Sequence, residues 1–187
     1  VSALCISGHK FHAPKGIGAL IARPSFPIKP MLLGGPQESQ KRAGSENLAG
    51  ILGLAEALAI LQKEQPSITA ALSDLRSYLE ESLLRAVPNV QIHGQGPRIA
   101  NTVNAAFPGI EGELLLMQLD LAGVAVSHGS ACSSGALEPS RVLTQMGIDR
   151  KLARSSIRIS LGKYNTREEI DTFIAILQGI LSKVKNI

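Results

Sequence analysis

The sequence contains no tryptophan and few other aromatic residues, with four phenylalanines and two tyrosines among 187 residues. Proteins that bind nucleic acids usually combine clustered lysine and arginine with aromatic side chains that stack on bases. Here the basic residues are scattered along the chain, although they give a net charge of +4 and a pI of about 9.3. The composition therefore argues against nucleic-acid binding and indicates a mildly basic soluble protein.

Long hydrophobic runs are also missing. No apolar run approaches the roughly 20 residues that a membrane-spanning helix needs, and no charged-then-apolar signal segment opens the chain. We therefore expect no membrane partner and a cytoplasmic location, or an organellar one if a leader has been removed. Because the chain starts with valine and residues 1–7 already look like the middle of a buried strand, we expect a fragment whose preceding residues are missing.

Cysteine is scarce, since only Cys5 and Cys132 occur. Two cysteines are too few for a disulfide framework, which favours a reducing compartment. Cys5 lies in an apolar run and is predicted to be an inert core thiol. Cys132 lies among the small residues 126–135, which predict a flexible loop that exposes a thiolate. A nucleophile and an unreactive loop residue both remain open, whereas a zinc site on Cys132 and His128 lacks further ligands at a suitable spacing.

The first part of the chain predicts two strands, a long loop and two helices. The apolar runs 1–7 and 17–22 are predicted to be strands that are covered on both faces and joined by a hairpin-like linker. Frequent prolines exclude regular structure after residue 23. Ser45 is predicted to be the N-cap of a helix that runs to about Glu64, where Pro66 separates it from a second helix. That second helix is expected over 67–87.

The remaining chain predicts a small sheet covered by helices. The expected strands are 90–93, 102–107, 124–126 and 156–161. The expected helices are 111–121, ended by Gly123, 140–146, ended by Gly147, and a last helix that opens with a capping box at Thr166 and Glu169. The prediction is an α/β fold, in which 1–64 form the end of a large domain with its connecting helix and 65–187 form a small C-terminal α/β domain.

Two basic residues are candidates for chemistry. Lys10 follows Ser7, Gly8 and His9 at a predicted strand end, and small donors beside a lysine suit a pyridoxal-phosphate site. From spacing alone a solvated surface lysine is the commoner outcome. Arg158 lies on the alternating strand 156–161, where its guanidinium is suited to grip a substrate carboxylate through two hydrogen bonds. A structural salt bridge is an equal alternative for Arg158.

These residues stand in four motifs that occur in the order of a known family. The motifs are Ser7-Gly8-His9-Lys10 with Pro14-Lys15-Gly16-Ile17-Gly18, Gly34-Gly35 with Arg42-Ala43-Gly44-Ser45-Glu46-Asn47, Gly129-Ser130-Ala131-Cys132-Ser133-Ser134-Gly135, and Ser155-Ser156-Ile157-Arg158-Ile159-Ser160-Leu161-Gly162. The whole chain resembles the C-terminal half of the class I (NifS/IscS-type) cysteine desulfurases. This family belongs to the fold-type I, class-V aminotransferase superfamily that depends on pyridoxal phosphate.

The resemblance implies roles for the candidate residues. Lys10 would hold pyridoxal 5'-phosphate as a Schiff base and then move protons. The segment Ser7-Gly8-His9 would contact the cofactor phosphate, and Ser45 would reach the phosphate of the partner subunit in a homodimer. Arg158 would hold the carboxylate of L-cysteine. Cys132 would attack the substrate sulfur, giving alanine and a persulfide for an iron–sulfur scaffold or another acceptor. No resident metal is expected, apart from transient iron–sulfur contact through Cys132.

The chain departs from the family pattern at several points. Ser45 replaces the usual threonine and keeps its hydroxyl, whereas Leu33 and Pro36 interrupt a usual His-Gly-Gly-Gly run. The family's ring-nitrogen aspartate and stacking histidine lie upstream of Lys10, so we expect the 187 residues alone to be inactive and to bind the cofactor poorly. The alternatives are a selenocysteine lyase, an aminotransferase-like relative and a non-catalytic module that docks onto a scaffold.

Overall fold

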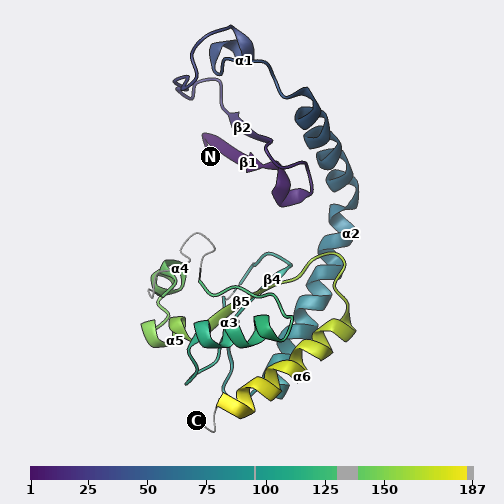
Figure 1. Cartoon of the computed structure of the whole chain (residues 1–187), viewed down its shortest axis with the longest axis vertical. Helices are drawn as coiled ribbons and strands as arrows, with labels where there is room; N and C mark the ends of the chain where they lie inside the picture. The colour runs from purple at the N-terminus through teal and green to yellow at the C-terminus, as the bar shows by residue number, and fades with distance from the viewer. Residues whose placement is uncertain (95, 130–138, 185–187) are drawn as a thin grey trace. The chain divides into compact units, whose positions relative to one another are not determined.

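The computed structural model describes residues 1–94, 96–129 and 139–184. Both helices and strands occur in each part of the chain, as expected for an α/β protein (Figure 1). The residues group into two compact units, Val1–Pro66 and Ser67–Ile187. The candidate residues are therefore divided between the units, with Lys10 in the first and Arg158 in the second.

The first unit begins with a β-hairpin. Strand β1 (Ala3–Ser7) pairs antiparallel with β2 (Gly18–Ala22), and a 3-10 helix, η1 (Gly8–Phe11), follows β1 directly. Glycine is required at position 18, because a Cβ atom there would lie 2.6 Å from the carbonyl oxygen of Ile6. The two predicted strands and their hairpin connection are confirmed, but the prediction that both faces are covered is wrong, since most residues of the two strands are exposed.

Cys5 is exposed, so the prediction of an inert core thiol is wrong. The reason is that β1 and β2 form a sheet of only two strands among the described residues. Apolar side chains on this ribbon, such as Leu4 and Ile21, are about half exposed as well, at 52% and 56%. An apolar run indicates that a strand is suited to burial, but it does not provide the element that covers it.

The proline-rich segment after β2 is irregular, as predicted, apart from the short element α1 (Gln37–Gln40). Its residues Glu38, Ser39 and Gln40 have positive φ angles of 50°, 54° and 62°. L-amino acids disfavour this left-handed region by about 1–2 kcal/mol per residue. The element is therefore a left-handed turn rather than an ordinary helix.

Helix α2 spans Leu48–Ala86, and the hydrogen bonds at its start identify Asn47 as the N-cap. The side-chain Oδ1 of Asn47 accepts the backbone N–H of Gly50 at 3.0 Å, which is the usual N-cap bond. The prediction that Ser45 caps this helix is wrong by two residues. Ser45 remains in the exposed loop that leads into the helix.

The predicted break at Pro66 is also wrong, because Pro66 lies inside α2, a single helix of 39 residues. Proline lacks the N–H that would bond to the carbonyl of Gln62, but its fixed φ is compatible with a helix. The residues beyond Pro66 are held in the core of the second unit by buried leucines such as Leu79 and Leu83, both 0% exposed. This burial offsets the lost hydrogen bond.

The second unit contains a three-stranded antiparallel sheet in the order β3 (Gln91–His93), β4 (Thr102–Ala106) and β5 (Ser156–Ser160). Its apolar face packs with α3 (Gly112–Leu121), α6 (Arg167–Val184) and the last part of α2 (Figure 1). Full burial of each large aliphatic side chain stabilises a fold by about 1.5–3 kcal/mol. The fully buried aliphatic residues of this core are Leu79, Leu83, Val103, Leu115, Leu119, Ile157 and Leu177.

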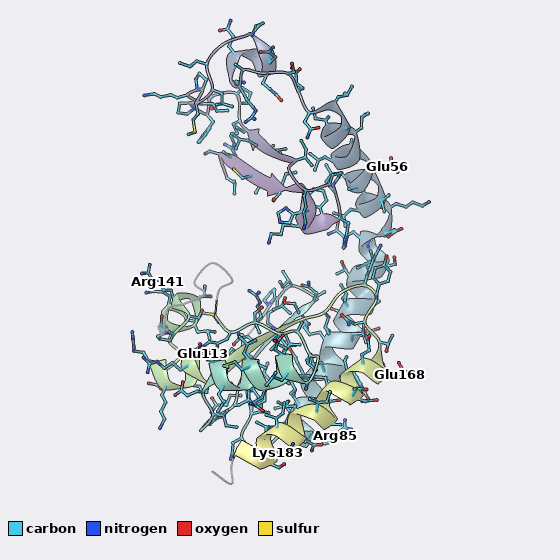
Figure 2. All side chains as sticks on the ribbon, viewed as in Figure 1. Glu56, Arg85, Glu113, Arg141, Glu168 and Lys183 are labelled. Carbon is cyan, nitrogen blue, oxygen red and sulfur yellow. The ribbon has the colours of Figure 1, made fainter. Side chains whose placement is uncertain are left out.

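The helix ends of the second unit follow the sequence signals closely. In the capping box of α6, Thr166 N–H donates to Glu169 Oε2 at 3.0 Å and Glu169 N–H donates to Thr166 Oγ1 at 3.3 Å. Glu168 lies in the first turn of α6 and Lys183 in the last, which suits the helix dipole (Figure 2). Gly123 follows α3 with a φ of 80°, as expected for a helix end.

The short helix α4 (Arg141–Gln145) was predicted. Two other parts of the second unit, α5 (Arg150–Arg154) and the segment 124–126, differ from the prediction. Helix α5 was not predicted; Asp149 caps it by accepting the N–H of Lys151 at 2.8 Å. The segment 124–126 is not a strand. This segment and the end of β5 both line a cavity of about 530 Å³, and the next residue, Ser127, forms an isolated bridge to Arg158 of β5.

Gly112 at the start of α3 offers a test of packing in the second unit. A Cβ atom there would overlap His128 Nδ1 and would lie 2.7 Å from the carbonyl oxygen of Arg154. We expect Gly112→Ala to destabilise the full-length protein by about 1–3 kcal/mol in urea unfolding. The matched control is Gly179→Ala in α6, where the new Cβ meets nothing within 4 Å. Because alanine has a higher helix propensity than glycine, this control should increase the free energy of unfolding by up to about 1 kcal/mol. Equal effects of the two variants would contradict this packing.

Candidate functional site

Lys10 lies on η1, immediately after β1. Its side chain is exposed and makes no hydrogen bond or ion pair with any residue that the structure describes. Ser7 Oγ and His9 Nδ1 lie 3.2 Å apart in hydrogen-bonding contact. The hairpin therefore brings a hydroxyl and an imidazole together beside a primary amine.

Gly8 holds this turn in place. It is buried, its N–H donates to the carbonyl of Ile17 at 2.9 Å, and its own carbonyl accepts the N–H of Ala13 at 3.1 Å. A Cβ atom on Gly8 would lie 2.9 Å from Ile17 O and 3.1 Å from Ala13 Cβ, so a side chain has no room. The backbone that carries Lys10 is thus fixed by the hairpin itself.

The same turn is braced by α2. A Cβ atom at Gly53 of α2 would lie 2.7 Å from Pro14 Cγ, which shows how closely Pro14 packs on this helix. Since Pro14 follows η1 by only a few residues, the lysine turn rests on both a strand pair and a helix. Catalytic side chains need such rigid support to keep their geometry.

Ser45 lies in a loop that is tied to the preceding glycine-rich turn. The N–H of Gly44 donates to Gln37 Oε1 at 3.2 Å, and the N–H of Ala43 donates to the carbonyl of Leu32 at 3.2 Å. Ser45 itself is exposed, and its hydroxyl makes no hydrogen bond within the described part of the chain. The hydroxyl is therefore available to a ligand.

Arg158 lies at the centre of β5 and is half-buried. Its Nη2 donates to Ser127 Oγ at 3.3 Å, and the backbones of the two residues exchange hydrogen bonds of 2.7 and 3.0 Å. Its Nε is buried without a hydrogen-bond partner among the described residues. Neither salt bridge observed in the described chain involves Arg158, which disfavours a purely structural ion pair.

Cys132 lies outside the described residues, but the segment that leads to it is anchored to β5 twice. The first anchor is the Ser127 bridge to Arg158. The second is His128, whose Nδ1 lies 2.8 Å from the carbonyl oxygen of Ser156 and so acts as the donor. The chain thus leaves the sheet beside Arg158, five residues before Cys132.

Sequence reasoning did not identify Ser127, His93 or Asn104, which lie near Arg158 in the sheet. A signal for Asn104 was present, because Thr102 and Asn104 alternate with the apolar Val103 and Ala105 and so mark a polar face. His93 is buried and its Nε2 lies 3.1 Å from Ser156 Oγ. Because the Ser156 hydroxyl already donates to Leu152 O at 2.8 Å, His93 Nε2 must carry the proton.

Burial lowers the pKa of His93 because it disfavours the charged imidazolium. In the unfolded chain the ordinary pKa of histidine is about 6.5, so the unfolded state takes up this proton first as the pH falls. We expect the unfolding free energy to decrease as the pH falls below about 6.5, and to decrease less in His93→Gln. Urea unfolding of both proteins over this pH range measures the difference; parallel pH profiles would contradict it.

The comparison with protein families identifies the fold. Residues 1–173 match the model of the class-V aminotransferases. The chain belongs to the class-V aminotransferase family. Members of this family generally depend on pyridoxal phosphate, and the α/β fold predicted from the sequence is confirmed.

Similar members of the class-V aminotransferase family are cysteine desulfurases. The chain is 42% identical over 188 residues to the cysteine desulfurase IscS of Dictyoglomus turgidum, covering 100% of this chain and 48% of that protein. It is 44% identical over 186 residues to a cysteine desulfurase of Klebsiella pneumoniae, covering 99% and 47%. The solved NifS-like protein of Rickettsia africae superimposes with a TM-score of 0.85 at 34% identity, covering 97% and 48%. The chain spans about half the length of the curated relatives it matches.

The described residues contain neither a membrane span nor a metal cluster. No helix among them is both long and apolar enough to cross a bilayer, and no three or more of their His, Cys, Asp and Glu side chains are grouped to hold a metal ion. The lysine turn does suit pyridoxal phosphate, since it offers two polar side chains, a close-packed glycine and an amine that has no partner in the part of the chain that the structure describes. Ser7, His9 and Lys10 are thus the residues of this unit that fit the cofactor.

Proposed function

We propose that the whole protein is a cysteine desulfurase, which converts L-cysteine to L-alanine and leaves a persulfide on Cys132. The observation that carries this proposal is the 42–44% identity to cysteine desulfurases over essentially the entire chain. Two features support it independently among the described residues: the exposed amine of Lys10 has no partner, and the half-buried guanidinium of Arg158 forms no ion pair.

In the first unit, Lys10 would hold pyridoxal phosphate covalently through its Nζ. When bound, this cofactor withdraws electrons from the substrate α-carbon. The Ser7 hydroxyl and the His9 imidazole would donate hydrogen bonds to the phosphate, with the Gly8 backbone closely packed beneath them. Once substrate has released the Lys10 amine, that amine would accept a proton from the α-carbon and later return one to carbon.

In the second unit, Arg158 would bind the substrate carboxylate. The guanidinium presents paired N–H groups that match a carboxylate, and partial burial strengthens such a charge-assisted contact. Ser127 Oγ accepts one of the two Nη2 hydrogens, and the other Nη hydrogens remain for the carboxylate. Arg158 would thereby orient the substrate so that its Sγ faces the attacking thiolate.

The sulfur transfer would be carried out by Cys132. Its thiolate attacks the substrate Sγ, so an S–S bond forms while the Cβ–Sγ bond breaks. The electron pair of the broken bond stays with the carbon skeleton, which takes up a proton at Cβ and leaves as alanine. The enzyme cysteine is oxidised to a persulfide and the substrate carbon is reduced, so the step needs no external oxidant. An iron–sulfur scaffold or another acceptor would then receive the sulfur.

Ser45 would complete the cofactor site across a homodimer. Its hydroxyl is exposed and makes no hydrogen bond within the described chain, so it is available to the phosphate of the partner subunit's cofactor. This proposal makes activity depend on dimer formation. We also propose that the whole protein is located in the cytoplasm.

The reaction is tested by incubating the full-length protein with L-cysteine and measuring alanine and protein-bound persulfide together. A desulfurase forms one persulfide for each alanine in the first turnover. Turnover of selenocysteine but not cysteine would identify a selenocysteine lyase instead, and production of a keto acid would identify an aminotransferase. Absence of any lysine-linked cofactor would favour a non-catalytic docking module.

A further inference from the structure

A polar row crosses the sheet of the second unit. His93 of β3 lies directly opposite Asn104 of β4, and Asn104 lies directly opposite Arg158 of β5. Residues that face each other across strands point to the same side of a sheet. The opposite side carries Val103, Ile157 and Ile159, which belong to the hydrophobic core. Asn104 is therefore the immediate neighbour of Arg158 on the polar face.

Both members of this pair have an unused polar atom. Asn104 Oδ1, an acceptor, and Arg158 Nε, a donor, are buried and make no hydrogen bond with the described residues. A buried polar atom without a partner costs about 1–3 kcal/mol. A donor and an acceptor that are both unsatisfied at directly opposite positions are complementary to each other.

We propose that Asn104 is a positioning residue for Arg158, whose Nε–H donates to Asn104 Oδ1 when the substrate carboxylate binds. Directly opposite residues of an antiparallel pair have Cβ atoms about 4.5–5.5 Å apart, so side-chain rotation alone brings the two groups into contact. The proposal rests on the carboxylate-binding role given to Arg158.

The count of guanidinium hydrogens explains why this contact suits catalysis. Arginine has five N–H hydrogens in a planar fork. Ser127 takes one from Nη2, and Asn104 would take the one on Nε. The three that remain are two on Nη1 and one on Nη2, so each Nη atom keeps a hydrogen with which to bind a carboxylate oxygen.

The amide also has the appropriate charge. An aspartate at position 104 would accept the same hydrogen bond, but it would neutralise the guanidinium and compete with the substrate carboxylate. A neutral oxygen orients Arg158 and leaves its charge for the ligand. Among the described residues, Asn104 is the side chain directly opposite Arg158 in the sheet ladder, so no second residue of β4 can replace it.

The test uses Asn104→Leu in the full-length holoenzyme, because leucine has a similar size but no acceptor. We expect the KM for L-cysteine to rise about tenfold, which corresponds to about 1.4 kcal/mol, with kcat and the absorbance of the lysine-linked cofactor little changed. Thr102→Val, two residues away on the same face of β4, is the matched control and should leave KM unchanged. If the leucine variant does not fold, Asn104→Ser replaces it in the test, because the serine side chain is too short for its oxygen to reach Arg158 Nε.

A second readout separates positioning from a general structural defect. L-alanine and ethylamine differ only by a carboxylate, and the cofactor absorbance reports the binding of each. Asn104→Leu should weaken the binding of L-alanine about tenfold and leave that of ethylamine unchanged. Equal weakening of both ligands, or no weakening of either, would overturn the proposal.

Arg158→Lys distinguishes this inference from the proposed function. If Arg158→Lys raises the KM for cysteine and Asn104→Leu does not, the positioning role is wrong and the carboxylate-binding role of Arg158 stands. If neither variant changes KM, both roles are wrong. If both raise KM and both selectively weaken L-alanine, the two proposals are supported together.

Discussion

Lys10→Ala is expected to reduce cysteine turnover by the full-length protein at least about 1,000-fold, which corresponds to about 4 kcal/mol of activation free energy. The variant loses both the covalent attachment of the cofactor and the amine that moves the proton at the substrate α-carbon. Gly8 and the hairpin hydrogen bonds fix the backbone around Lys10 independently of its side chain, so the variant should fold. Alanine release measures the loss of turnover, and the absorbance of the lysine-linked cofactor measures the loss of covalent attachment.

The matched control for this prediction is Lys29→Ala, because Lys29 is an exposed lysine in the irregular segment of the same unit. It should keep full turnover and full absorbance. Borohydride reduction followed by peptide mass spectrometry should place the cofactor on the peptide that contains Lys10. A cofactor adduct on another lysine, or turnover in Lys10→Ala within tenfold of the wild type, would refute the assignment.

Cys132→Ser is expected to abolish persulfide formation and to reduce alanine production at least about 1,000-fold, because a serine hydroxyl at neutral pH is a far weaker nucleophile than a thiolate. The lysine-linked absorbance should remain, since Cys132 takes no part in holding the cofactor. Labelling of the persulfide with an alkylating reagent, followed by mass spectrometry of the peptide, measures the first effect. The contrast with Lys10→Ala is that chemistry is lost while the cofactor is kept.

Cys5→Ser provides the control for the cysteine variant, because Cys5 is the other thiol of the sequence and is exposed in the structure. Exposure alone would make it an alternative sulfur acceptor. We expect Cys5→Ser to form persulfide and alanine at the wild-type rate. If persulfide appears on Cys5, or if Cys132→Ser forms persulfide as fast as the wild type, Cys132 is not the acceptor.

Local sequence signals predicted most element positions in both units, because they depend on neighbouring residues. The capping box of Thr166 and Glu169 occurs as expected, and Gly123 ends α3 in a left-handed conformation. The alternation of residues 156–161 likewise predicted β5. Such signals depend on hydrogen bonds and dihedral angles within a few residues.

Two misses were local, namely the Ser45 cap and the unpredicted helix α5, whereas three others depended on contacts between distant residues. Pro66 does not break α2, because Leu79 and Leu83 anchor the second half of the helix in a core built from later segments. The segment 124–126 is not a strand, and the contact with β5 is made by the next residue, Ser127. Cys5 is exposed because nothing among the described residues covers its face of the hairpin. In each case the local pattern was suitable, but tertiary packing decided the outcome.

The sequence by itself determined the chemical groups and their order: Ser7, His9 and Lys10 at a strand end, Arg158 on an alternating strand, and Cys132 among small residues. Residue types and close spacing are enough for that. Only the tertiary structure decided which neighbours Arg158 has, because strand register brings together residues that lie far apart in the chain. It joined Arg158 to Ser127 and set Asn104 opposite Arg158, since pairing of β4 with β5 aligns their side chains across about 5 Å. Asn104 Oδ1 and Arg158 Nε thus lie on facing residues, each without a partner among the residues that the structure describes.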